Sequence, residues 1–472
     1  MNKIIKITLA LFCMGILLYS CQEEKMDESI PVNPVLNPIK SVTAQDGNRI
    51  TTAVISNENR TIHLEFANLS TEERKAVPVK LEISKRAKLI TPTDTLLTLD
   101  LTQPNSITVN NLLKDITYEL TASGPFRIEL WRKTASELDF VQHNNGAIAF
   151  SGDYLVVHER TKFDYYNIKD GTKAGTMSFE GIDWETLTRT VPLYMAGDEA
   201  GNIVATNFYM SRWIPAGGTN TIHMFWWKGV TAKPELLFSY DVDLDDLPGN
   251  KDVGRKIFVK GDLKKHAFLY MGVSFQNMFL RWEVKDGKVV SEKPDKVSFD
   301  PGYQMGMQPT IVPVELGKNS NYFIPRFENG TGKVAITYMD GTTNKPSYAS
   351  EHHIQDVFHQ WLVGGGHAFD YMQANGHHYI FMIEQEPKNW MREIFDIKKV
   401  MEDPGSIKSI MDLIHTRKWN DWLTFPMDAA YGDNGNNTGD VITRVSADGK
   451  TGTVAFLCTN SGIVVWEINL EN

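Results

Sequence analysis

The stretch Val464-Val465-Trp466-Glu467-Ile468-Asn469, three residues before the end of the chain, decides the fold because its pattern recurs upstream. An aromatic residue, a polar residue and then Ile or Val also occur at Trp282–Val284, Tyr166–Ile168 and Phe395–Ile397. With two partial matches included, the aromatic positions are Tyr166, Trp227, Trp282, Tyr338, Phe395 and Trp466. Subtracting successive positions gives intervals of 61, 55, 56, 57 and 71 residues. Such near-regular self-similarity predicts six repeats of one β-unit.

Glycines show a second period that does not depend on the aromatic one. Gly171, Gly229, Gly287 and Gly341 are spaced at 58, 58 and 54 residues. Three of the four follow an aspartate, and an Asp-Gly pair is typical of a tight hairpin turn with positive φ. The agreement of the two periods is the strongest sequence evidence for the repeat.

The first repeat predicts what each unit contains. Four strand-like runs, separated by turn residues, occupy 147–150, 154–158, 163–168 and 176–179. Four antiparallel strands joined by tight turns make one propeller blade. We therefore expect an all-β chain in which residues 126–472 form a six-bladed β-propeller, with seven blades as the alternative. The recurring aromatic would lie on the third strand and pack between blades, which assigns Trp282, Phe395 and Trp466 to the core.

The last repeat supplies only three strands before the chain ends. They are Asp440–Val445, Thr453–Cys458 and Gly462–Ile468. A fourth strand must come from elsewhere, or the ring keeps an exposed edge. Phe126–Trp131 alternates correctly, so we expect it to pair beside Gly462–Ile468 and close the ring. Leu138–Val141 is the alternative closing segment. Pro404–Arg417 departs from the strand pattern and has the spacing of a helix.

A smaller domain precedes the propeller. Residues 39–125 contain short alternating runs bounded by turn residues, which predict an immunoglobulin-like β-sandwich. The runs are Ile50–Ile55, Thr61–Phe66, Val77–Ile83, Leu96–Leu101, Ile107–Val109 and Thr117–Ala122.

The N-terminus has the features of an export signal. Lys3 and Lys6 precede the apolar run Ile7–Tyr19, which is too short for a membrane span, and Leu18-Tyr19-Ser20-Cys21 follows. This ending resembles the lipobox of bacterial lipoproteins, which implies a signal peptide over residues 1–20 and acylation of Cys21. Residues 21–38 would be an acidic, proline-rich tether, and their acidic start resembles the surface-export signal of Bacteroidota-type lipoproteins. An ordinary cleaved signal is the alternative.

Composition limits the functional class. The 472 residues include 42% hydrophobic residues, which excludes a disordered chain. The formal charge of -10, with no basic run, makes a nucleic-acid partner a poor expectation. The chain has three cysteines, and Cys458 lies in an apolar run, which favours a buried thiol.

No motif predicts a cofactor, a metal or a catalytic residue. Six histidines fall between His352 and His378, but the paired spacing of zinc peptidases is absent. Asp433–Asp440 is rich in oxygen ligands, yet its register departs from that of a calcium loop. No phosphate loop, dinucleotide fingerprint or nucleophile elbow is present.

Aromatic residues outside the repeat are the best binding candidates. Trp213 follows Arg212, Trp390 follows a Pro-Lys-Asn stretch, and Trp419 and Trp422 flank Asn-Asp. Loop tryptophans offer flat faces on which sugar rings stack, and exposed aromatics are unfavourable unless something covers them. The alternative is that they cover the propeller's own core.

Over nearly its whole length the chain resembles uncharacterised Bacteroidota-type surface lipoproteins with a small sandwich and a C-terminal propeller. The resemblance implies an outer-membrane protein of a polysaccharide-utilisation system. It favours non-catalytic binding of a glycan or another small polar ligand, with Arg212 and the four tryptophans as site residues. The alternatives are a glycoside hydrolase or lyase with acids in the channel, and a scaffold for protein partners at the outer membrane.

Overall fold

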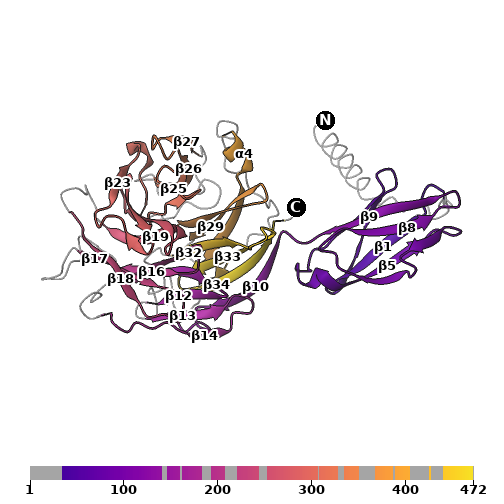
Figure 1. The fold of residues 1–472 in the computed structure, drawn as a ribbon, viewed down its shortest axis with the longest axis horizontal. Coiled ribbons are helices and arrows are strands. Elements are labelled where there is room, and N and C mark those ends of the chain that lie inside the picture. The colour runs from indigo at the N-terminus through magenta and orange to yellow at the C-terminus, as the bar shows by residue number, and fades with distance from the viewer. Residues whose placement is uncertain are drawn as a thin grey trace, which may run out of the picture. The chain divides into compact units, whose positions relative to one another are not determined.

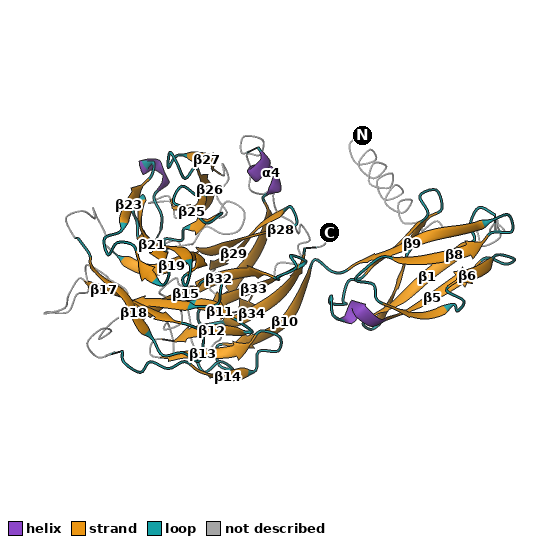
Figure 2. Ribbon diagram, in the orientation of Figure 1, coloured by secondary structure: helices purple, strands orange, loops and turns teal. Residues whose placement is uncertain are grey.

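The structure, a computed structural model, describes most of the chain beyond its first 34 residues. The described residues are 35–140, 146–159, 162–182, 193–207, 221–243, 252–306, 308–327, 334–349, 367–385, 389–403, 425–426 and 439–470. The chain divides into two compact units, Met1–Pro125 and Phe126–Asn472. Strands dominate both units, and the few helical segments are short (Figures 1 and 2).

The first unit contains two sheets that share one apolar core. One sheet has the strand order β2-β1-β5-β7 and the other β3-β4-β9-β8-β6. The strands are β1 (Ile39–Asp46), β2 (Arg49–Thr52), β3 (Val54–Ser56), β4 (Thr61–Glu65), β5 (Val77–Ile83), β6 (Lys88–Thr91), β7 (Leu96–Leu99), β8 (Asn105–Asn110) and β9 (Asp115–Ser123). Alternation explains their burial, since every second residue of β5 is buried.

Most of these strands match the runs that the sequence predicts, and two were missed. The alternation in β1 is irregular, with a register shift between Ile39 and Ser41. β6 is short and half-exposed. The immunoglobulin-like topology stays a prediction. β4 and β9 pair in parallel, a feature that no short-range pattern could indicate.

The second unit is built from antiparallel sheets of the kind that form propeller blades (Figure 1). Four sheets follow the chain in order: β11 to β14, β15 to β18, β24 to β27 and β28 to β31. A fifth contains β19 to β22, with β23 also pairing β21, and a sixth has the order β10-β34-β33-β32. All-β architecture with blade-like sheets is therefore confirmed.

Along the chain, the strands of the sheets before β24 are β11 (Ile148–Ser151), β12 (Tyr154–Glu159), β13 (Lys162–Asn167), β14 (Lys173–Thr176), β15 (Leu193–Gly197), β16 (Ile203–Asn207), β17 (Thr221–Trp227), β18 (Glu235–Asp241), β19 (Val253–Asp262), β20 (His266–Val273), β21 (Met278–Lys285), β22 (Lys288–Val289) and β23 (Asp295–Ser298). Those of the others are β24 (Val312–Pro313), β25 (Tyr322–Phe327), β26 (Val334–Met339), β27 (Pro346–Ala349), β28 (His367–Ala374), β29 (His377–Gln385), β30 (Asn389–Asp396), β31 (Phe425–Pro426), β32 (Gly439–Val445), β33 (Thr451–Cys458), β34 (Gly462–Asn469) and β10 (Arg127–Thr134).

The closing strand is the one that the alternation predicts. β10 pairs with β34 in antiparallel register from Arg127 opposite Ile468 to Thr134 opposite Gly462. The first strand of this unit thus completes a sheet whose other three strands end the chain. The alternative closing segment, Leu138–Val141, is not in a strand over its described residues.

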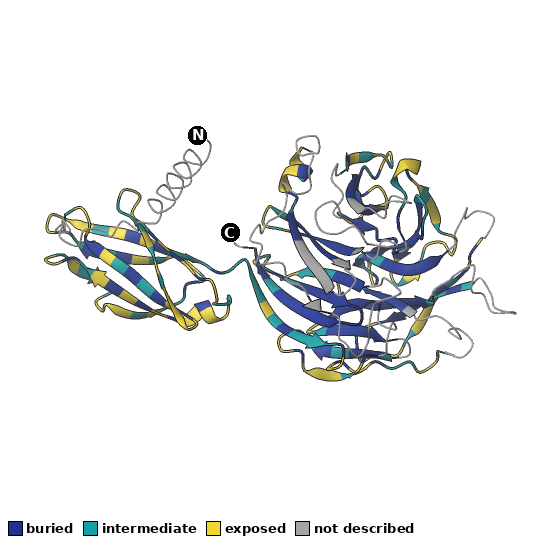
Figure 3. Ribbon diagram, turned by 180° about the vertical axis from the view of Figure 1, so that it is seen from behind, coloured by how far each residue is buried: buried dark blue, intermediate teal, exposed yellow. Residues whose placement is uncertain are grey.

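The recurring aromatic lies on the third strand of each sheet, as predicted. All six are buried, from 0% exposed for Trp227 to 7% for Tyr338. Trp282 contacts Phe238 and Tyr240 of the preceding sheet, which shows the packing between sheets that the repeat requires. Burial falls from the first strands toward the outer ones, as Figure 3 shows for this unit.

Two local predictions need correction, and a third is not tested. The fourth strand of the first repeat lies at Lys173–Thr176, ahead of the predicted 176–179, because the turn at Gly171 is tight. Gly171 has a φ of +69°, but Gly341 has no positive φ. Gly341 is required instead by close approach, since a Cβ there would collide with the Ser320 carbonyl. The short helix α4 spans Lys398–Glu402, and the predicted helix Pro404–Arg417 lies outside the described residues.

Candidate functional site

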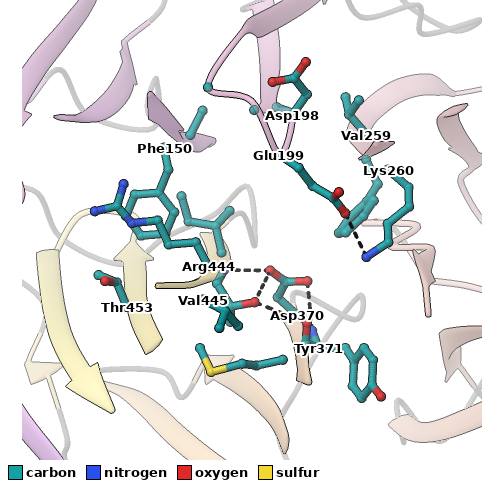
Figure 4. A pocket seen from close by; sticks show the side chains of 18 of the residues that line it. Phe150, Asp198, Glu199, Val259, Lys260, Asp370, Tyr371, Arg444, Val445 and Thr453 are labelled. Carbon is teal, nitrogen blue, oxygen red and sulfur yellow. Dashed lines mark hydrogen bonds and ion pairs between the residues drawn. The ribbon is translucent and has the colours of Figure 1, made fainter. Parts of the chain in front are cut away.

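The first strands of the sheets surround a cavity of about 790 Å³. Each first strand forms one edge of its sheet, and β28 contacts β32, β32 contacts β11, β11 contacts β15, and β15 contacts β19. The lining comes from five of these strands, from their first hairpin turns, from Thr451 and Thr453 of β33, and from Val314, close to β24. Polar and charged side chains line it together with apolar ones (Figure 4).

A buried ion pair joins β19 to β32 beside the cavity. The Lys256 ammonium donates to Asp440, and the two side chains are 6% and 1% exposed. Asp440 also accepts from the backbone N–H groups of Ile148, at 3.0 Å, and Val441, at 2.9 Å. Burial raises the pKa of Asp440, and the nearby Lys256 partly offsets this. The pair therefore ties three sheets together, and Lys256 is among the residues that line the cavity.

Asp370 on β28 is the second buried acid. Its carboxylate accepts from the backbone N–H and hydroxyl of Thr443 on β32, at 2.7 and 3.0 Å, and from Tyr371 N–H at 2.8 Å. Burial raises the pKa of Asp370 to about 6, although these hydrogen bonds and Lys256 act in the opposite direction. The carboxylate fastens β28 to β32 across the boundary between two sheets.

Asp198 has a similar role in the turn after β15. It accepts from the backbone N–H groups of Ala200, Asn202 and Leu263. The last of these belongs to the next sheet. Burial raises its pKa as well. The three buried acids thus satisfy backbone donors, and this is the common way for a buried charge to be compensated.

The cavity rim carries two further cations. Lys260 pairs with Glu199 at 3.0 Å. The Arg444 guanidinium lies 4.9 Å from the centre of the Phe150 ring and donates to the Gly152 carbonyl. Figure 4 shows these groups on different sides of the cavity. The site therefore combines hydrogen-bond donors and acceptors with one flat apolar ring.

His158 is a buried base in the first sheet. It is 0% exposed, and its Nδ1 accepts from Gly146 N–H at 3.4 Å. The ring lies against Phe163 and Tyr194. Burial lowers the pKa of His158 to about 3, so the imidazole is neutral at physiological pH. Among the described residues, no three His, Cys, Asp or Glu side chains gather as a metal site would require.

Of the binding residues that the sequence predicts, only Trp390 has a described backbone. It lies in strand β30, opposite Gln385 and Phe425, and not in the loop that the sequence suggested. This is the end of the sheet near His367, whereas the same sheet lines the cavity through Asp370–Gln373. Cys21, Arg212, Trp213, Trp419 and Trp422 lie outside the described residues. Their roles stay predictions.

The cavity residues were not predicted. Lys256, Asp370 and Arg444 are charged residues next to apolar residues within strand segments, and a charge at such a position is the signal that could have drawn attention to them. This signal does not indicate that the three residues line the same cavity.

A family model described as "Domain of unknown function (DUF8500)" matches residues 133–467. The chain belongs to the DUF8500 family. The match begins within β10, so the closing strand of this DUF8500 protein lies mostly before the matched region. No curated protein matches it in sequence.

Several solved structures are similar to this DUF8500 protein. A DUF4623 family protein from Bacteroides eggerthii matches with a TM-score of 0.50 and 14% identity, covering 92% of this chain and 98% of that one. An α-L-arabinanase from Penicillium chrysogenum, solved with arabinobiose, has a TM-score of 0.43 and 11% identity over 74% and 98%. The WD40 domain of SCAP from fission yeast has a TM-score of 0.30 and 9% identity over 93% and 97%. At such identities the likeness concerns the fold alone. None of the helices in the described part of the DUF8500 protein has the length and hydropathy to span a bilayer.

Proposed function

We propose that this DUF8500 protein is a non-catalytic surface lipoprotein that binds a carbohydrate, or a similar polyhydroxylated ligand, in its central cavity. The observation that carries the proposal is the cavity itself. Its volume of about 790 Å³ is within the range of small-molecule sites. Its lining offers hydroxyl, amine, guanidinium and carboxylate groups, with the Phe150 ring as an apolar face. Hydroxyl-rich ligands need this mixture of donors and acceptors.

The hydrogen bonding of the acids favours binding over hydrolysis. Glycosidases use two carboxyl groups on either side of the scissile bond, each available to a proton or to water. Asp198 and Asp370 line the cavity, but each is engaged by at least three donors from the chain. Asp440 is held by Lys256 and two backbone groups. These carboxylates are better suited to holding the sheets than to transferring protons.

The proposal includes the wider arrangement that the sequence predicts. The six sheets would be the six blades of a propeller closed by β10, and the first unit an immunoglobulin-like spacer. Acylation of Cys21 would anchor the chain in the outer membrane, because several acyl chains on one residue hold a protein firmly. The ligand would be a glycan taken up by a polysaccharide-utilisation system.

Calorimetric titration of the full chain with a panel of plant, host and microbial oligosaccharides tests the binding. Thr453 lines the cavity on β33 and is half-buried, so Thr453→Phe should fill the space and weaken binding at least tenfold. Thr108→Phe, at a half-buried strand position in the first unit, is the matched control and should leave affinity unchanged. Trp390→Ala tests the sequence-based candidate separately.

Three results would count against the proposal. If Thr453→Phe leaves binding intact, the ligand binds outside the cavity. Release of reducing ends from any member of the panel, lost in Asp370→Asn, would make the protein a hydrolase. Absence of binding to the whole panel, with a protein partner retained from outer membranes, would favour a scaffold.

A further inference from the structure

Arg444 is the one cation among the described cavity residues that has no carboxylate partner there. Lys256 is paired with Asp440, and Lys260 with Glu199. Arg444 instead donates one hydrogen bond to the Gly152 carbonyl and lies over the Phe150 ring. It is half-buried, so its charge is only partly compensated by water.

The geometry leaves most of the guanidinium available. Arginine has five N–H donors in a planar fork, and the contact with Gly152 uses one side of it. The contact with the Phe150 ring attracts the guanidinium without using its N–H donors. A partly dehydrated guanidinium matches a carboxylate, which it can bind through two parallel hydrogen bonds.

The acids near the cavity do not remove this preference. Asp198 and Asp370 face backbone N–H donors of the protein, and these donors compensate their charge. Glu199 is paired with Lys260. Asp153 attracts Arg444, but it is exposed in the turn after β11, where water screens its charge. The formal charge of -10 on the whole chain repels an anion only weakly at the site, because exposed charges are screened beyond about 8–10 Å.

We propose that the ligand of the cavity carries a carboxylate that pairs with Arg444, as the uronic acid units of acidic polysaccharides do. This inference rests on the proposed function and narrows its ligand class. Arg444 would then decide between acidic and neutral sugars, while the other groups of the lining bind hydroxyls that both have.

Titration of the full chain with paired probes tests the inference. The probes are trigalacturonate and a glucuronate oligosaccharide, each compared with its methyl ester, which keeps the sugar and removes the charge. We expect the better acid to bind about 10- to 100-fold more tightly than its ester, the range for a charged hydrogen-bonded pair. Raising the salt concentration should weaken binding of the acid and leave binding of the ester unchanged.

Variants assign the preference to one residue. Arg444→Gln should lower the affinity for the acid to that for the ester, without changing the affinity for the ester. Arg444→Lys should retain part of the preference for the acid. Arg132→Gln, on β10, is the control and should behave as the wild type. Equal affinity of acid and ester in the wild type, or a preference that survives Arg444→Gln, would overturn the inference. If neutral sugars still bind and Thr453→Phe blocks them, the proposed function stands without it. If neither these probes nor any member of the oligosaccharide panel binds, both the inference and the proposed function fail.

Discussion

Truncation of Trp131 should loosen the sheet that joins the two ends of the second unit. Trp131 lies on β10, is 8% exposed, and packs in a core that includes Tyr166 and Val465. Its indole N–H donates to the carbonyl of Ile168, the residue after β13, at 2.8 Å. Trp131→Ala removes a large buried side chain, which costs about 3–5 kcal/mol. Trp131→Phe keeps much of the packing but leaves the carbonyl without its donor, a loss of about 1–3 kcal/mol.

The thiol of Cys458 reports this opening directly. It is 0% exposed on β33, whose neighbour β34 pairs with β10. The thiol is modified only when the sheet opens, so its labelling rate follows the free energy of opening when reclosing is fast. The expected increases are about 100- to 5,000-fold for Trp131→Ala and about 5- to 150-fold for Trp131→Phe.

Mass spectrometry of the peptide that contains Cys458 separates its labelling from that of Cys13 or Cys21. Leu96→Ala changes a side chain that is 66% exposed in the first unit, and it should alter the rate by less than about threefold. Wild-type labelling of Cys458 in Trp131→Ala would refute the view that β10 holds this sheet closed.

Three further predictions concern buried ionisable groups. The pKa of Asp370 is raised to about 6, above the value of about 3.9 in an unfolded chain. The folded state therefore holds this proton more tightly than the unfolded state does, and the unfolding free energy should fall as pH rises from about 4 to 6. Urea titrations across that pH range should show a fall of up to about 1.4 kcal/mol per pH unit in the wild type and none of it in Asp370→Asn; the same dependence of unfolding free energy on pH in both proteins would contradict the prediction. The pKa of His158 is lowered to about 3, so stability should be lost as pH falls below about 6.5, and His158→Gln should reduce that loss in the same titrations; equal acid sensitivity in the two proteins would show that the ring is not the cause. Lys256→Met should cost about 3–5 kcal/mol in denaturant unfolding because it leaves the Asp440 carboxylate buried without its cation. Adding Asp440→Asn should recover most of the loss, because the amide is neutral and its oxygen can still accept from a backbone N–H; a single variant as stable as the wild type would show that the pair is dispensable.

The parts of the fold that sequence could predict are those set by repeated local packing. Each blade-like sheet needs a large side chain at one place on its third strand, so Trp282 and Trp466 carry the same short pattern. The closing strand was also predictable, because an edge left open at Gly462–Ile468 requires a partner with matching alternation. Where the reason for a residue was not local, prediction failed. Gly341 is fixed by the approach of Ser320 and not by its own φ.

The cavity could not be predicted for the same reason. Lys256, Asp370 and Arg444 are separated by more than seventy positions at each step, and only the gathering of first strands brings them to one cavity. Each shares its strand with other polar residues, and a charged residue in a largely buried strand can be structural or functional. Asp370 shows both aspects, since it lines the cavity and fastens β28 to β32.

The most direct test of the account is a crystal structure of the full chain with the saccharide that binds it most tightly. The account predicts ligand density inside the central cavity, with an acidic group within hydrogen-bonding distance of Arg444 and hydroxyls near Thr443 and Thr453. An empty cavity, with the ligand seated elsewhere on the protein, would contradict it.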